Sequence, residues 1–286
     1  MDLLAVTAFG IVSGIATLVL LALGLAVIFG MMGVINLAQG EFLMLGAYTV
    51  LLTTAHGGSV WAGIALAPLV VGFVGVAVER TVIRFLYGRT LDTMLATWGL
   101  SLALIGIVTL GFGPTTEGIA TPLGHVAVGR YSVAHYQGFV IAVALGSLGL
   151  TWGLFNWTRF GLVARATMQN AGMVAGLGVN PSRVYMGTFA FGSALAGLGG
   201  AVMAPLTGVV PTFGLAFIAK IFITVIVGGP VILLGTTTAG GVLGLVESLV
   251  SYASTPIYGQ VAMLVFAIVL LRLLPQGISG FWRRGV

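Results

Sequence analysis

The sequence predicts an all-α, polytopic membrane protein with about eight or nine transmembrane helices, some of them interrupted. Two observations predict this class. The chain has 286 residues, of which 59% are hydrophobic and only 6% are charged, whereas roughly a quarter of the residues in a soluble domain are charged. It also contains 45 glycines, a content that suits a membrane bundle because small residues let helix backbones approach closely. We expect one transmembrane domain over residues 1–286.

The first segment, 3–55, is almost unbroken hydrocarbon and is too long for one span. About 50 helical residues measure ~80 Å, against a bilayer core of ~30 Å, so the segment must cross twice. Its only strongly polar side chains, Asn36, Gln39 and Glu41, fall between the two crossings and are flanked by glycines. Polar groups at membrane depth usually line an interior path, which makes these three residues candidates for a pathway lining. The alternative is that they cap the broken helix ends.

Further apolar stretches predict the remaining spans, which are 60–78, 93–112, 135–156, 184–204, 216–229, 231–250 and 258–273. Three groups of arginines separate them, and the positive-inside rule assigns each group to the cytoplasm. The loop at 113–134 then lies outside, the N-terminus lies outside, and the C-terminus lies in the cytoplasm. The N-terminus has no basic region and reads as a retained span, not a cleaved signal peptide. The arginine groups are Arg80, Arg84 and Arg89; Arg159, Arg165 and Arg183; and Arg272, Arg283 and Arg284.

A second interruption is expected near residue 230, where Gly228-Gly229-Pro230 breaks the helix. Together with the first break it gives one interrupted helix in each half of the chain, a pattern that points to a midplane pathway in transporter folds. Some hydroxyl groups in the apolar spans are candidates to hydrogen-bond a passing solute, although such groups more often bond their own helix backbone. These candidates are Thr97, Ser101, Thr236 and Thr237, the last two within a run of three threonines. Glycine pairs at positions 10 and 14 and at 240 and 244 have the spacing of helix-contact motifs.

Several functional classes are excluded by the composition. Lys220 is the only lysine and follows Ala219, so the chain cannot carry a nucleotide-binding P-loop, which requires Gly-Lys-Ser/Thr. With no cysteine, the chain has neither disulfides nor thiol chemistry. His56, His125 and His135 lie at predicted span ends and lack metal-ligand spacing. We expect no catalytic residues, no metal site and no nucleic-acid partner, because the net charge of +5 reflects arginines that orient the spans.

The cytoplasmic segment 159–183 differs from the other loops. Its pattern predicts a short helix that ends at Gly178, before Asn180-Pro181-Ser182 turns the chain into the next span. Such a helix can lie on the membrane face or dock into the groove of a partner, and on pattern alone an interfacial connector is the simpler interpretation. Its apolar side chains recur at roughly helical intervals, at Leu162, Ala166, Met173 and Leu177.

Several motifs, in order along nearly the whole chain, resemble the LivH-type branched-chain amino-acid permeases of ABC importers, a family that has urea-type permeases as close relatives. The motifs are GLAVIFGMMGVINLAQGEF at 24–42, DTMLATWGLS at 92–101, RVYMGTFAFGSALAGLGG at 183–200 and the Gly-Gly-Pro at 228–230. The segment 159–183 is similar to the cytoplasmic coupling loop of such permeases. Under this resemblance we favour a coupling helix there, with Arg165, Asn170, Met173, Leu177 and Gly178 as the residues that contact or shape the ATPase interface.

The resemblance implies a permease subunit that forms half of the translocation pathway for branched-chain amino acids or similar small polar solutes. It implies a bacterial cytoplasmic (inner) membrane and, besides membrane lipid, three kinds of partner: a second, related permease subunit, two cytoplasmic ATPase subunits and an extracytoplasmic solute-binding protein. ATP is then used by the partner subunits, and this chain itself holds no cofactor. The pathway residues under this interpretation are Asn36, Gln39, Glu41, Thr97, Ser101, Thr236 and Thr237.

One departure and two alternatives accompany this interpretation. Many family members have histidine at the position of Gln39, and the neutral amide, which cannot titrate near neutral pH, argues against a proton relay there. An apolar tunnel with few hydrogen-bonding groups suits urea or short amides equally well. A self-sufficient channel or ion-coupled carrier is an alternative from another class; a carrier is expected to hold carboxylates at midplane depth, and only Glu41 qualifies on the sequence.

Overall fold

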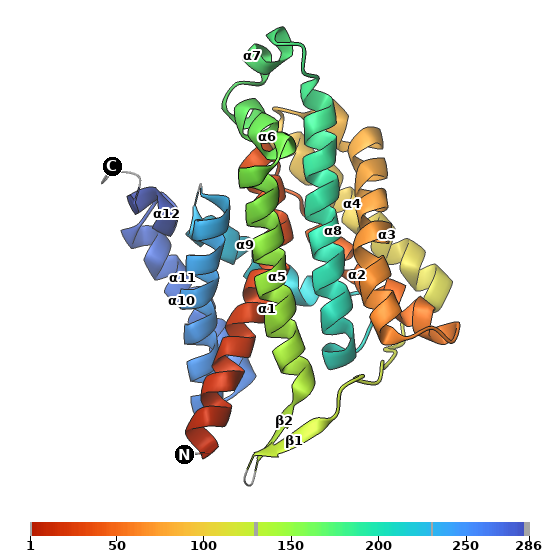
Figure 1. Cartoon of the computed structure of the whole chain (residues 1–286), viewed down its shortest axis with the longest axis vertical. Coiled ribbons are helices and arrows are strands. Elements are labelled where there is room, and N and C mark those ends of the chain that lie inside the picture. The colour runs from red at the N-terminus through yellow and green to blue at the C-terminus, as the bar shows by residue number, and fades with distance from the viewer. Residues whose placement is uncertain (1, 129–130, 230, 283–286) are drawn as a thin grey trace. The chain divides into compact units, whose positions relative to one another are not determined.

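The computed structural model describes residues 2–128, 131–229 and 231–282. Arg130, Pro230, Arg283 and Arg284 therefore lie outside the described residues, including two of the arginines used for the topology and the proline of the second break. The described elements in chain order are α1 (Asp2–Met32), α2 (Gln39–Ala55), α3 (Val60–Thr81), the 3₁₀ helix η1 (Ile83–Leu86), α4 (Thr90–Phe112), β1 (His125–Val128), β2 (Tyr131–Ala134), α5 (His135–Trp157), α6 (Arg159–Gln169), α7 (Ala171–Gly176), α8 (Pro181–Thr207), α9 (Leu215–Gly228), α10 (Ile232–Ala253), α11 (Pro256–Leu273) and α12 (Gly277–Trp282) (Figure 1).

Seven helices of the described chain are long and apolar enough to cross a membrane, which confirms the predicted polytopic helical class. Two further helices are shorter, with 17 residues in α2 and 14 in α9. At about 1.5 Å per residue they measure roughly 26 Å and 21 Å, less than the ~30 Å of a bilayer core. The predicted eight or nine spans thus correspond to seven full-length helices and two short ones.

The loop predicted at 113–134 contains an element that the sequence analysis missed. Strands β1 and β2 pair antiparallel, with His125 opposite Ala134 and Val128 opposite Tyr131. Alternate positions hold valine or tyrosine, residue types that favour strands. This hairpin is a small departure from the all-α prediction within the described residues.

The packing groups the chain into two compact units. Unit 1 comprises the described parts of Met1–Ala22, Ala120–Leu148 and Ala219–Val286, and unit 2 comprises Leu23–Ile119 and Gly149–Ile218. Three of the boundaries fall within α1, α5 and α9, so each of these helices contributes residues to both units, and the fourth falls in the connection between α4 and β1.

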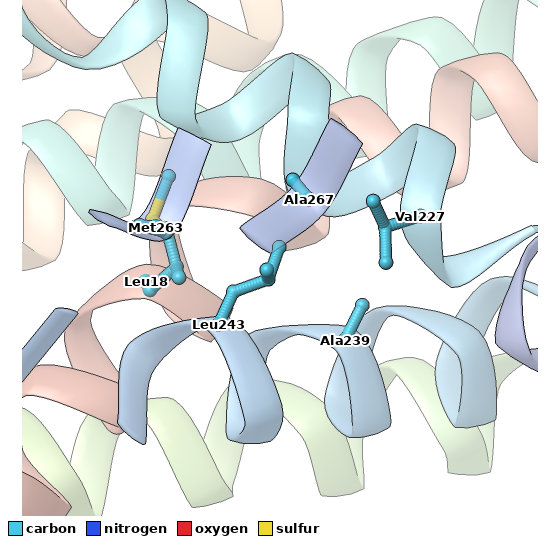
Figure 2. Packing of buried hydrophobic residues seen from close by; sticks show 6 residues of the cluster. All are labelled: Leu18, Val227, Ala239, Leu243, Met263 and Ala267. Atoms are coloured by element: carbon cyan, nitrogen blue, oxygen red, sulfur yellow. The ribbon is translucent and has the colours of Figure 1, made fainter. Parts of the chain in front are cut away.

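In unit 1 an apolar cluster joins four helices. Figure 2 shows its side chains converging from α1, α9, α10 and α11. Every member is at most 4% exposed, so the four helices share one core. The members are Leu18, Val227, Ala239, Leu243, Met263 and Ala267.

The two predicted glycine motifs are confirmed as helix contacts in unit 1, because they lie on the facing sides of α1 and α10. A Cβ atom added to any of the four glycines would come within 3.0 Å of the other helix, a distance that real Cβ contacts do not reach. Small residues therefore set how closely these helices approach. The atom nearest to the added Cβ is Tyr252 Oη for Gly10, Ser248 Oγ for Gly14, Val19 Cγ2 for Gly240 and Ile15 Cα for Gly244.

In unit 2 the helices α2, α3 and α8 pack side by side (Figure 1). Glycines bring the backbones of α2 and α8 into direct contact. A Cβ atom on Gly46 would lie 2.0 Å from the carbonyl oxygen of Gly197, and one on Gly200 would lie 1.9 Å from that of Leu43. Helix α2 is thereby held against α8 along its length, which fixes the position of the polar residues at its N-terminus.

Candidate functional site

The break between α1 and α2 is organised by Asn36. Residues 33–38 are not helical, and Gly33 turns the chain with a φ of 64°, a conformation that favours glycine. The Asn36 Oδ1 atom accepts a hydrogen bond from the backbone N–H of Ala38 at 3.1 Å, and its Nδ2 donates to Gln39 Oε1 at 3.3 Å. Asn36 therefore holds the turn that leads into α2 and also orients the neighbouring amide, whereas the helix start itself, at Ala38, has no side-chain cap.

Helix α4 meets this break with a stripe of hydroxyl groups. Thr93, Thr97 and Ser101 are spaced four residues apart and are all buried, at 2%, 0% and 3% exposed. The Thr97 hydroxyl accepts the backbone N–H of Leu37 at 3.1 Å, and the Ser101 hydroxyl hydrogen-bonds the carboxylate of Glu41. One helix face thus contacts both the irregular segment and the first turn of α2.

The structure brings five of the seven predicted pathway residues together in unit 2. We call this group the polar cluster; it consists of Asn36, Gln39, Glu41, Thr97 and Ser101, each at most 3% exposed. Two of its buried polar atoms, Gln39 Nε2 and Glu41 Oε2, have no hydrogen-bond partner among the described residues. Leaving a buried polar atom unpaired costs about 1–3 kcal/mol. An arrangement that leaves two such atoms at the break is suited to a solute or water that completes their hydrogen bonds.

The unpaired amide nitrogen of Gln39 occupies space that Gly24 leaves open because it has no side chain. A Cβ atom on Gly24 of α1 would lie 2.9 Å from Gln39 Nε2 and 2.5 Å from the carbonyl oxygen of Gly192 on α8. The amide therefore lies where α1 comes close to α8. A larger residue at position 24 would displace it.

Sequence reasoning missed two buried hydroxyl groups in unit 2. Thr93 precedes Thr97 by four residues, so helical spacing alone could have added it to the stripe. Ser193 of α8 also has an unpaired buried Oγ atom. It packs against Gly75 of α3, where an added Cβ would lie 2.6 Å from that oxygen. No local pattern signals this contact, because it depends on which glycine of α3 faces α8.

The remaining two predicted pathway residues, Thr236 and Thr237, lie in unit 1 on α10. Thr236 is 2% exposed, whereas Thr237 is exposed and donates its hydroxyl to the backbone oxygen of Leu233 at 2.7 Å. The geometry of Thr237 is the backbone-bonded alternative that the sequence analysis kept for these threonines. Their role in a pathway stays a prediction.

The single helix predicted over 159–183 is wrong, because the segment forms two helices, α6 and α7. Asn170 separates them in an extended conformation, with φ −155° and ψ 95°. Its Oδ1 atom accepts the backbone N–H of Met173 at 2.9 Å, so it caps α7. Asparagine commonly ends one helix and starts another in this way, because its side chain competes for backbone hydrogen bonds.

The end of α7 follows the prediction at Gly178. This residue has a φ of 86°, its N–H donates to the oxygen of Ala175 at 3.0 Å, and the N–H of Val179 donates to that of Val174 at 3.3 Å. This pair of bonds is a Schellman motif, which needs a left-handed residue at this position. Asn180 then caps α8.

Three large apolar side chains of this segment point away from the protein, whereas Ala164 and Val174 are buried. Leu162, Met173 and Leu177 are 62%, 69% and 79% exposed, and Arg165 is exposed with its guanidinium 3.5 Å from Asn156 Oδ1 of α5. A run of exposed large apolar residues is typical of a surface that a partner or a membrane covers. The predicted ATPase contact is compatible with this geometry and stays a prediction.

An ion pair in unit 1 was also missed. Lys220 of α9 donates to the carboxylate of Glu247 of α10, and both side chains are about one-fifth exposed. Glu247 lies inside the candidate span Ile232–Ala253, which corrects the expectation that only Glu41 places a carboxylate within the apolar helices. Because Lys220 neutralises Glu247, the pair is less costly in an apolar setting than either charge alone.

Comparison with known proteins decides the family. A family model described as the permease component of branched-chain amino acid transport systems matches residues 7–274, which include both helix breaks and the segment 159–183. The chain belongs to this family. It is therefore a multi-pass membrane protein, as the seven long apolar helices also indicate.

Curated members of this permease family resemble the chain over nearly their whole length. The high-affinity branched-chain amino acid transport system permease protein LivH of Escherichia coli (strain K12) is 29% identical, over 93% of this chain and 92% of the relative. BraD, the permease protein of the corresponding system of Pseudomonas aeruginosa, is also 29% identical with the same coverage. A probable LivH of Methanocaldococcus jannaschii is 28% identical over 93% and 90%. No solved structure matches the chain.

The two interpretations of Asn36 in this permease predict different mutational results. We expect Asn36→Leu to lower the maximal uptake rate about tenfold or more, because it removes both the bond to the Ala38 N–H and the amide that orients Gln39. Asn36→Ser keeps an oxygen that can accept the Ala38 N–H but cannot bond Gln39 in the same way, and a pathway role predicts reduced uptake for this variant too. Uptake by the assembled transporter and its binding to the ATPase subunits are measured for both. Wild-type uptake by Asn36→Ser would assign the residue to the structural role alone, which is to hold the turn before α2.

Proposed function

We propose that this chain forms half of the translocation pathway of an ABC importer for branched-chain amino acids. The observation that carries the proposal is the family match over residues 7–274, together with relatives whose names specify branched-chain amino acid transport. The polar cluster supports it, since it offers a few buried hydrogen-bonding groups among apolar helices. Such a lining suits a solute with an apolar side chain and a polar end.

The proposal includes the partners that such a subunit requires. The chain has no P-loop, so ATP is bound and hydrolysed by two cytoplasmic ATPase subunits, and the permease subunit needs no cofactor and catalyses no reaction of its own. A second, related permease subunit completes the pathway, and an extracytoplasmic binding protein delivers the solute. The exposed apolar side chains of α6 and α7 support the proposed ATPase contact.

The proposed orientation of the chain in the membrane is inferred from the positions of its arginines. Arg80 lies in the last turn of α3, and Arg84 and Arg89 lie between α3 and α4. Arg159 and Arg165 lie in α6, and Arg183 lies in the first turn of α8. The positive-inside rule assigns these connections to the cytoplasm. In a bacterial inner membrane the N-terminus then lies outside and the C-terminus lies in the cytoplasm.

Two other functions are distinguished by specific observations. Urea or a short amide would fit the same polar cluster, because neither needs a charged partner. An ion-coupled carrier would need a free carboxylate within the helices. Glu247 is paired with Lys220, and the carboxylate of Glu79, near the end of α3, accepts a hydrogen bond from Tyr87, which leaves Glu41 as the candidate in the polar cluster.

Reconstitution tests the proposal. The chain is incorporated into liposomes with its second permease subunit, ATPases and binding protein, and uptake of leucine and of urea is measured with and without ATP. We expect leucine uptake that requires ATP and the binding protein. Urea uptake without leucine uptake would select the alternative solute, and uptake by the chain alone without nucleotide would overturn the importer assignment.

A further inference from the structure

A cavity of about 340 Å³ lies in unit 2, where the end of α3 and η1 meet the start of α8. It is distinct from the polar cluster, with which it shares no residue. Its lining is strongly basic, with three arginines and one carboxylate. The charged and polar side chains that line it are Glu79, Arg80, Arg84, Asn180, Ser182 and Arg183.

The three arginines have no acidic partner. The ion pairs of the described chain are Arg89–Asp92 and Lys220–Glu247, and neither includes an arginine of the cavity. Glu79 is only 1% exposed, and its carboxylate accepts a hydrogen bond from the hydroxyl of Tyr87. Burial and this contact with Glu79 raise the pKa of Tyr87, so the phenol stays protonated and keeps donating. The carboxylate is thus engaged by a neutral donor, and the cavity keeps an excess of two positive charges.

The position of Arg183 adds a separate reason for an anion. Arg183 is the third residue of α8, and the first turn of this helix contains no acidic residue. A helix N-terminus carries partial positive charge, so a cation there is unfavourable unless an anion lies nearby. Arg80 and Arg84, by contrast, lie in the last turns of α3 and η1, where cations are favourable. The ends of α3 and η1 therefore supply one cation each, and the start of α8 supplies a third together with its dipole.

We propose that this cavity binds a phosphate group, presented by the headgroup of an anionic phospholipid at the cytoplasmic surface of the membrane. Guanidinium groups match phosphate oxygens with paired hydrogen bonds, and basic pockets between membrane helices bind such headgroups. The cavity lies where the candidate span Val60–Thr81 ends, at the depth of a headgroup. Phe85, which follows Arg84, is 72% exposed and offers apolar surface to an acyl chain.

A bound phosphate would tie the end of α3 to the start of α8. Asn180 and Arg183 directly follow the segment that contains α6 and α7, so the site adjoins the connection through which ATPase movement would reach α8. The dependence of transport on anionic lipid rests on the proposed function. The binding of phosphate does not, and is tested without transport.

Retention of lipid by the purified chain tests the site. The protein is extracted from nanodiscs of phosphatidylglycerol or of phosphatidylcholine, and native mass spectrometry measures the lipid that stays bound. We expect selective retention of phosphatidylglycerol. The triple variant Arg80→Gln, Arg84→Gln, Arg183→Gln should weaken it by about a hundredfold, because each basic residue contributes about 1 kcal/mol. Arg272→Gln removes an exposed arginine outside the cavity and should change retention less than about twofold.

Two further variants separate loss of binding from loss of folding. The triple Arg→Lys variant keeps the charge and should retain most of the lipid. Glu79→Gln keeps an acceptor for Tyr87 but removes the negative charge, so it should tighten retention several-fold, a gain that misfolding cannot produce.

A second arm identifies the source of the phosphate, by measuring the melting temperature in detergent with added inorganic phosphate. Stabilisation of the wild type but not of the triple Gln variant would assign free phosphate as a sufficient ligand. Selective phosphatidylglycerol retention without this effect would assign the lipid headgroup. Equal retention and equal melting for the wild type and the triple Gln variant, with no gain in Glu79→Gln, would overturn the site.

Discussion

Gly200→Ala is expected to prevent the stable assembly of unit 2. The added methyl group would lie 1.9 Å from the carbonyl oxygen of Leu43 and within 2.7 Å of its carbonyl carbon and Cα atom, so α2 would have to move away from α8. Backbone atoms cannot change rotamer to make room. We therefore expect a loss of stability at the upper end of overpacking, about 3 kcal/mol or more, measured as a lower melting temperature and a smaller folded fraction after detergent extraction.

The matched control is Gly106→Ala on α4. An added Cβ at Gly106 meets no atom within 4 Å, and alanine has the higher helix propensity by about 1 kcal/mol. This variant should be as stable as the wild type or more so. If Gly200→Ala melted at the wild-type temperature, the close approach of α2 and α8 would be incorrect, and with it the placement of the polar cluster.

Met173→Glu is expected to abolish ATP-driven uptake while the protein still folds and inserts. Met173 is 69% exposed, so a charge at this position remains solvated in the isolated subunit. If α7 docks into an ATPase groove, the same charge would be buried without a partner, at a cost of several kcal/mol. We expect uptake to fall more than tenfold and the ATPase subunits to be lost on purification.

Two variants accompany this test. Met173→Leu preserves the apolar contact and should transport nearly as well as the wild type. Gly178→Pro should resemble Met173→Glu, because proline cannot adopt the positive φ of the Schellman motif. Normal uptake by Met173→Glu, with ATPases still bound, would remove α7 from the transmission of movement and return it to the role of a connector.

Much of the candidate site was predictable from local sequence. Asn36, Gln39 and Glu41 stand out because they are the polar residues of a long apolar segment, and the structure places all three at a helix break. Asn170 was predicted to contribute to the ATPase interface. The sequence analysis missed its structural effect, which is to divide the segment 159–183 into α6 and α7. The helical repeat suggested one helix, whereas the bond from the Met173 N–H to the Asn170 side chain starts a second one.

The sequence by itself determined the membrane class, the order of the apolar helices and the two interruptions. The length of an apolar run and the helix-breaking effect of glycine and proline are properties of a single segment, so they can be recognised without its neighbours. Only the tertiary structure decided which segments meet. It placed Thr97 and Ser101 of α4 against the first break, paired Lys220 with Glu247, and gathered Arg80, Arg84 and Arg183 around one cavity. These contacts depend on which face each helix turns toward its neighbour, and that is set by backbone approach at glycines from different helices, such as Gly46 against Gly197. Such a match is a property of two surfaces, so neither segment specifies it alone.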